Sequence, residues 1–170
     1  GTLYFWTHNT PFGPTSGYVY SADDYATWNG SGSVSTSPGP NQNAPSGNIA
    51  AGQGFFVLGS AAGGSVVFNN DMRVKGNNLQ FFKSNDVETA NNVNPSETEE
   101  PIEKNRVWLN LQGGTNGFSQ ALVGYITNAT NDFDSRFDGP SFSGNSVAFY
   151  SINNTKKLTI QGRALPFVDT

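Results

Sequence analysis

Three aspartates stand within seven residues of one another in the polar segment NDFDSRFDG, residues 131–139. Hard carboxylate oxygens in a flexible loop are the ligands that Ca²⁺ prefers. The segment is not an EF-hand, because Arg136 stands where a third ligand would be and no Glu follows at the required distance. The same aspartates are suited to accept backbone N–H groups as Asx-turns, with Phe133 and Phe137 turned inward. We expect the Asx-turns and keep Ca²⁺ as a possible cofactor, with the candidate ligands Asp132, Asp134 and Asp138.

A second group of candidates combines aromatic rings with neighbouring carboxylates near residue 23. Tyr and Trp present a flat apolar face with a polar edge, which suits stacking on a sugar ring. Carboxylates beside such a ring accept hydrogen bonds from sugar hydroxyls. Trp6 and Trp108 lie within apolar strand patterns, so core packing is favoured for both. The candidate ligand-binding residues are Tyr18, Tyr20, Asp23, Asp24, Tyr25 and Trp28, with Tyr25 and Trp28 as the stacking platform.

Groups suited to catalysis are few. His8 is the single histidine and the chain has no cysteine, so a Ser-His-Asp triad would need His8. No G-x-S-x-G elbow accompanies it. The aspartates that could pair for glycoside hydrolysis lie in polar segments, without an apolar setting to raise the pKa of one of them. The sequence therefore predicts that the chain is not an enzyme.

Composition narrows the class of protein. The net charge is −4, and Lys156-Lys157 is the one adjacent basic pair, so no basic stripe exists for nucleic acid. No apolar run approaches the roughly 20 residues that span a bilayer, which argues against direct membrane insertion. Charged residues make up 13% of the chain, whereas 20 Gly and 21 Asn favour turns. This composition suits an extracellular bacterial protein.

The elements that would position these residues are strands. In the stretch Arg106–Ile126, Val107, Leu109 and Leu111 alternate with polar residues and Trp108, as in a half-buried strand. A Gly- and Asn-rich turn follows, and Phe118–Ile126 resumes as a second strand. The long hydrophobic alternation on both arms predicts that this hairpin is central in a sheet.

The remaining pattern is typical of an all-β fold. Roughly ten short strands at eight- to twelve-residue spacing, 49–58 and 65–68 among them, fit a two-sheet antiparallel β-sandwich, jelly-roll-like, with little or no helix. Ser21 to Asp24 is the exception, since it is suited to cap a single helical turn that runs to Trp28. The predicted core contains Val107, Leu109, Leu111, Leu122, Phe55, Val57, Phe149 and Ile160.

The chain reads as one domain, residues 1–170, and both ends resemble cuts within a longer polypeptide. Residues 84–103 form a compositional shift that holds six of the thirteen acidic residues. With few apolar residues to anchor it, this segment is expected to be an exposed acidic loop insert. If Val93 and Ile102 were buried instead, that interpretation would be wrong.

The order of the apolar blocks resembles a β-rich region of large secreted proteins of Bacteroidota, ahead of the C-terminal sorting domain read by the type IX secretion system. The resemblance covers nearly the whole chain, and its most distinctive blocks are GQGFFV, RVWLNL and IQGRALPF. It implies export across the outer membrane, followed by attachment to the cell surface or release. It implies no catalytic residues, and it places the sorting domain after residue 170.

Two functions remain open at this point. The first is a non-catalytic structural or adhesive spacer that contacts neighbouring domains of the same chain, surface glycans or other copies of itself. The second is a carbohydrate-binding accessory module. The spacer is favoured because the chain lacks the groups that chemistry requires.

Overall fold

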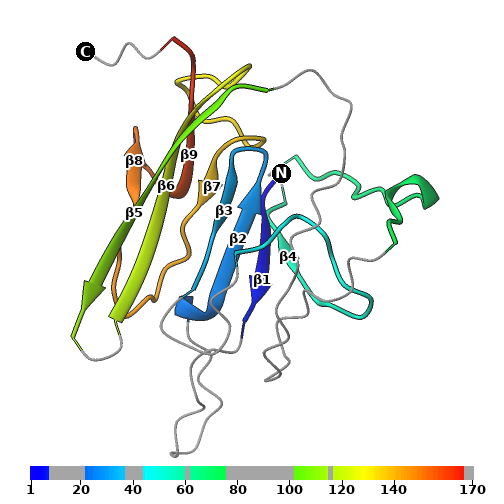
Figure 1. Cartoon of the computed structure of the whole chain (residues 1–170), viewed down its shortest axis with the longest axis horizontal. Coiled ribbons are helices and arrows are strands. Elements are labelled where there is room, and N and C mark those ends of the chain that lie inside the picture. The colour runs from blue at the N-terminus through cyan, green and yellow to red at the C-terminus, as the bar shows by residue number, and fades with distance from the viewer. Residues whose placement is uncertain (8–21, 37–43, 60–61, 76–101, 115–116, 167–170) are drawn as a thin grey trace, which may run out of the picture.

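The computed structural model describes residues 1–7, 22–36, 44–59, 62–75, 102–114 and 117–166. These residues form two β-sheets and two short 3-10 turns, and none of the described ranges contains an α-helix. The predicted all-β, two-sheet architecture is therefore confirmed (Figure 1).

The first sheet, sheet A, has four antiparallel strands in the order β3-β2-β1-β4. Its strands are β1 (Leu3–Trp6), β2 (Tyr25–Asn29), β3 (Gly32–Val34) and β4 (Phe56–Val57). The predicted turn before β2 is the 3-10 turn η1 (Ala22–Asp24), after which the chain continues extended instead of helical. The strand predicted over 49–58 is reduced to β4, because glycines at 52 and 54 interrupt it.

The second sheet, sheet B, follows the order β5-β6-β9-β7, and β8 pairs with β9 off this path. Its strands are β5 (Lys104–Gly113), β6 (Gly117–Ile126), β7 (Gly139–Pro140), β8 (Ser151–Asn153) and β9 (Lys156–Arg163). The pair β6–β9 is parallel, with Leu122 opposite Ile160. The expectation of antiparallel pairing throughout is wrong for this pair. The long connection through β7 and β8 allows it, since parallel neighbours need a crossover.

The predicted hairpin is present, but it is not central. β5 pairs with β6 from Lys104↔Ile126 to Gly113↔Gly117, and β5 is the edge strand of sheet B within the described residues. Val107, Leu109 and Leu111 are 54%, 46% and 40% exposed, so their assignment to the core is wrong. The opposite side of β5 faces sheet A, where the Trp108 indole N–H donates to the Ser33 carbonyl at 2.9 Å.

The core lies between the two sheets. Val34 of sheet A packs with Leu122 and Ile160 of sheet B, and a second cluster joins Ile126, Ala129 and Phe137. Leu122 and Ile160 are fully buried as predicted, whereas Phe55 and Phe149 are half-buried and Val57 is exposed. The inter-sheet core thus contains fewer of these side chains than the sequence predicts.

Polar side chains supplement this small core by binding the backbone of β7 and of the segment that precedes it. The Ser31 hydroxyl and the Asn29 amide donate to the Phe137 carbonyl at 2.6 and 3.1 Å. The Thr2 hydroxyl donates to the Asp138 carbonyl at 3.1 Å. The Tyr4 hydroxyl donates to the Pro140 carbonyl at 2.8 Å, and burial raises the pKa of Tyr4 to about 12. These bonds tie sheet A to sheet B.

A third layer covers the other face of sheet A. In β1 and β2, Leu3, Phe5 and Trp28 point away from sheet B, because Tyr4 and Val34 take the inner side. Residues 44–55 and 62–75 lie over this outer face, and the Phe55 ring packs 6.4 Å from the Phe5 ring. Residues 65–68 form no strand, so the strand predicted there is wrong.

Most of the predicted acidic insert, residues 84–101, lies outside the described residues. Ile102 is 38% exposed, which agrees with an exposed position for the end of the segment. Glu103 donates its backbone N–H to the Thr127 hydroxyl at 3.2 Å, where the segment joins β5.

Candidate functional site

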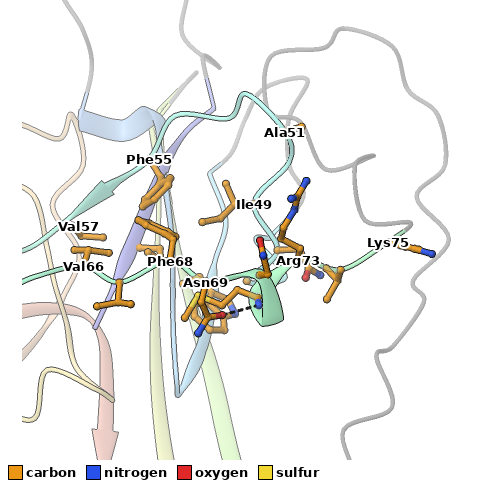
Figure 2. A pocket seen from close by; sticks show the side chains of 17 residues that line it. Ile49, Ala51, Phe55, Val57, Val66, Phe68, Asn69, Arg73 and Lys75 are labelled. Atoms are coloured by element: carbon orange, nitrogen blue, oxygen red, sulfur yellow. Dashed lines mark hydrogen bonds between the residues drawn. The ribbon is translucent and has the colours of Figure 1, made fainter.

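A large groove lies between the outer face of sheet A and the covering segments (Figure 2). Its volume is about 1190 Å³, which is sufficient for a sizeable ligand or a stretch of polypeptide. Seventeen residues line it, from β1, β2, β4 and residues 47–75. They include Leu3, Trp28, Gly47, Phe55, Val57, Val66, Val67, Phe68, Met72, Arg73 and Lys75.

Trp28 forms part of the groove wall, and Gly47 packs directly against its indole. A Cβ atom on Gly47 would lie 2.6 Å from two atoms of the indole ring, and Gly47 has a φ of +90°. Both observations require glycine at this position. Trp28 is therefore half-buried, with part of its ring covered by the backbone at residue 47.

The opposite wall is apolar and open to solvent. Val66, Val67, Phe68 and Met72 are 60–67% exposed, and the Phe68 ring meets Phe55 edge-on at 6.2 Å. Exposed apolar side chains gathered on one surface mark an interaction site. The wall is held by the 3-10 turn η2 (Asn70–Met72), whose cap residue Asn69 accepts the Met72 N–H through its side chain at 3.2 Å.

The charge of the groove is positive. Arg73 and Lys75 are the charged side chains among the lining residues, and no acidic side chain lines the groove in the described parts of the chain. Figure 2 shows Val57, Val66, Phe55 and Phe68 gathered at one end, with Arg73 and Lys75 toward the other. The groove thus combines an apolar surface with a cationic end.

The structure separates the aromatic residues predicted to form one stacking platform. Tyr25 lies on the inner face of β2, with its ring 5.0 Å from Phe142 and 5.7 Å from Phe56. Trp28 lies on the outer face, in the groove. The joint platform of Tyr25 and Trp28 is therefore wrong, because residues three apart in a strand point to opposite faces. Tyr18 and Tyr20 lie outside the described residues.

The aspartates expected beside that platform make other contacts. Both oxygens of the Asp23 carboxylate accept the Ser146 backbone N–H at 3.0 Å, which fixes η1 to the segment before β8. Asp24 is buried, and its carbonyl accepts the Thr7 hydroxyl at 2.9 Å. Of the candidate ligand-binding residues that the structure describes, Trp28 alone lines the groove.

The candidate metal ligands form the predicted Asx-type turn. Asp138 accepts the Asp134 N–H at 2.8 Å and the Gly162 N–H at 2.9 Å, and Asp134 accepts the Arg136 N–H at 2.9 Å. Asp132 is exposed, and its carbonyl accepts the Thr130 hydroxyl at 2.9 Å. Within the described ranges, no group of three or more His, Cys, Asp or Glu side chains is placed to hold a metal ion.

Burial controls the ionisation of Asp138. The side chain is fully buried, and this raises its pKa above the usual value, while the N–H groups of Asp134 and Gly162 act in the opposite direction. The two bonds join the 131–139 segment to β9. The role of Asp138 in this geometry is structural.

The residues that make the groove apolar are not apparent from the sequence. Val66, Val67 and Phe68 form an uninterrupted apolar run without alternation, which is also the pattern of a buried strand. The signal in the sequence is the Gly63-Gly64 pair before this run, since paired glycines indicate a turn. Both glycines have a positive φ in the structure.

The chain belongs to the family described as Domain of unknown function (DUF8693), whose model matches residues 1–170. Comparison with curated proteins gave no match, and comparison with solved structures gave none. In the described residues, no helix is long and apolar enough to cross a membrane.

Proposed function

We propose that this chain is a non-catalytic extracellular domain of a secreted or surface-attached bacterial protein, which works as a structural or adhesive spacer. The observation that carries the proposal is the groove on sheet A, with its exposed apolar wall of Val66, Val67, Phe68 and Met72. The resemblance to the region ahead of the type IX sorting domain supports export to the cell surface.

The hydrogen bonds that the carboxylates accept support a non-catalytic role. Asp23, Asp134 and Asp138 accept backbone N–H groups at 2.8–3.0 Å, so the structure uses them to join segments. A general acid or base needs a proton-transfer partner in a substrate site, and none of these three lines the groove. A hydrolase or lyase turnover by the purified chain would contradict the proposal.

The groove favours a polypeptide partner with apolar side chains and an acidic flank. The apolar wall would bury the partner's side chains, and Arg73 and Lys75 would attract carboxylates next to them. Such a segment would come from a neighbouring domain of the same protein or from another surface protein.

A carbohydrate-binding role is the second candidate, and Trp28 in the groove is the observation that favours it. Stacking of a sugar on this ring would need the part that Gly47 leaves uncovered. Asn48, Asn69 and Asn70 line the same groove and would supply amide hydrogen bonds.

Two peptide probes test the polypeptide role. One carries alternating Val and Ser with two Glu at its end, and the other replaces both Glu with Lys. We expect the Glu peptide to bind more tightly in fluorescence polarisation, and Phe68→Lys to weaken it about tenfold, since one apolar anchor is worth about 1.4 kcal/mol. The control is Ile152→Lys, at an equally exposed apolar residue on β8 that does not line the groove.

The peptide measurements and a glycan array together distinguish the two candidate functions. Equal binding of both peptides, or none, would refute the polypeptide role. A class preference on a glycan array that disappears in Trp28→Ala would assign the groove to carbohydrate instead.

A further inference from the structure

The outer edge of β5 is a second feature suited to contact, and it lies on a different sheet from the groove. β5 is ten residues long and ends sheet B, with β6 as its pairing partner among the described residues. All ten residues are exposed. A long exposed edge strand is a template for pairing with another chain.

The hydrogen bonds at the base of the hairpin show which backbone groups face outward. Thr127 donates its N–H to the Glu103 carbonyl at 3.1 Å, so Glu103 points its backbone polar groups toward β6. Orientation alternates along an antiparallel strand. The backbone groups of Arg106, Trp108, Asn110 and Gln112 therefore point away from β6, toward the outer edge of the sheet formed by the described residues.

The side chains of β5 divide into two sets. Val107, Leu109 and Leu111 share the face of sheet B that points away from sheet A, and they stay substantially exposed. The positive charges, Lys104 and Arg106, are confined to the start of the strand. Charges of this kind guard an edge against pairing, and the second half of β5 has none.

We propose that β5 pairs antiparallel with β5 of a second copy of this chain, about a two-fold axis at Leu109. This register places each Val107 opposite Leu111 of the second copy and Leu109 opposite its own equivalent, so that all three aliphatic residues are matched. Arg106 falls opposite Gln112, so no two cations face each other. Arg106, Trp108, Asn110 and Gln112, whose backbone groups face outward, form the hydrogen-bonded pairs.

The register distinguishes this arrangement from other antiparallel pairings. A shift by one residue would bring outward backbone groups opposite inward ones and lose the hydrogen bonds. A two-fold axis at Arg106 would place two guanidinium groups side by side, which is destabilising. The pairing at Leu109 joins the two B sheets into one continuous sheet with a self-complementary interface.

Sedimentation equilibrium of the whole chain tests the association. We expect a reversible monomer–dimer equilibrium, with a dissociation constant raised at least tenfold by Leu109→Lys, which opposes two ammonium groups at the axis. Gln112→Pro should have the same effect, because it removes an outward N–H that β6 does not use. Ile152→Lys, at an exposed apolar residue on β8 outside both the groove and β5, is the control and should dimerise like the parent.

Single cysteines test the register, since the chain has no cysteine of its own. In a non-hydrogen-bonded pair the Cα atoms are about 4.5 Å apart, within the range of a disulfide. Leu109→Cys should thus oxidise to a covalent dimer. Leu111→Cys should not, because the two Leu111 Cα atoms would be roughly 14 Å apart. A chain that stays monomeric, a dimer unaffected by Leu109→Lys, or equal cross-linking at both positions would overturn the proposal.

Discussion

Asp138 shows at the residue scale how a buried carboxylate holds two distant segments together. It accepts one N–H from its own turn, at Asp134, and one from β9, at Gly162. A carboxylate can accept both bonds because it carries no donor. An amide of the same shape offers one oxygen and one NH₂ group, so it would leave one of these N–H groups facing another donor.

We therefore expect Asp138→Asn to lower the free energy of unfolding by about 1–3 kcal/mol, the cost of one buried unsatisfied donor. Urea denaturation followed by tryptophan fluorescence measures the change. Asp132→Asn is the control, because Asp132 is exposed and contributes its backbone carbonyl instead of its carboxylate. It should change stability by no more than about 0.5 kcal/mol. Equal effects of the two substitutions would contradict the structural role of Asp138.

The same comparison has a defined pH dependence. Burial raises the pKa of Asp138 above 3.8 in the folded protein, so ionisation costs more in the folded state than in the unfolded state. The unfolded state therefore loses its proton first as the pH rises, and this favours unfolding. A protonated carboxyl keeps acceptor capacity on both oxygens, whereas the NH₂ group of Asn has none. The stability advantage of the parent over Asp138→Asn should therefore be largest below pH 3.8 and shrink as the pH rises to the folded-state pKa. An advantage that grows over this range would contradict the raised pKa.

The polar turn at 131–139 is predictable from the sequence because Asx-turns depend on residues close together in the chain. It is otherwise for a surface built from separate strand positions. The prediction that Tyr25 and Trp28 form one surface, which rested on their proximity in the sequence, is wrong. Their separation follows from the strand conformation of β2, which replaced the expected helical turn. In a helix, residues three apart share a face, whereas in a strand they do not.

At the scale of the element, β9 depends on a close approach to the turn that contains Phe137. A Cβ atom on Gly162 would lie 2.5 Å from the Cβ of Phe137 and 3.0 Å from the Ser31 hydroxyl oxygen. Gly162 also lies opposite Gly124 in the parallel pairing of β6 and β9. β9, the turn that contains Phe137 and the β2–β3 connection that contains Ser31 therefore meet where there is no space for a side chain at residue 162.

We expect Gly162→Ala to lower the free energy of unfolding by about 1–3 kcal/mol, as overpacking of a closely packed site does. Chemical denaturation measures the loss. Gly59→Ala is the matched control, since a Cβ there meets nothing within 4 Å. That variant should keep or slightly raise stability through the unfolded chain. A tolerated Gly162→Ala would show that β9 can move away from Phe137.

The hairpin of β5 and β6 marks what periodicity predicts and what it leaves open. Alternation correctly placed Val107, Leu109 and Leu111 on one face, and the turn residues correctly placed the reversal. Trp108 lies on the opposite face of β5, so both faces carry apolar side chains. The alternation alone therefore does not indicate which face meets sheet A. The face of β5 that meets sheet A is set by β6, where Leu122 lies opposite Trp108 and is part of the core.

For the whole molecule, stability is concentrated between the sheets and declines toward the groove. β6 and β9 contribute Leu122, Leu158 and Ile160, which are fully buried, and the hydrogen bonds to Phe137 join the two sheets there. Residues 62–75 are exposed throughout, and they belong to no strand of either sheet. Regions with few buried contacts open at low free energy.

Native-state hydrogen exchange should therefore divide the chain into two classes. Amides of β6 and β9 should exchange only through global unfolding, with protection that falls as denaturant is added. Amides of residues 62–75 should exchange through local opening at rates that low denaturant leaves unchanged, because little surface is exposed when they open. A partner bound in the groove should slow exchange in 62–75, by ordering that wall, without changing the intrinsic opening of β6 and β9. If residues 62–75 in the free chain were protected as strongly as β9, the outer layer would belong to the cooperative core, and the groove would not be an open surface for a partner.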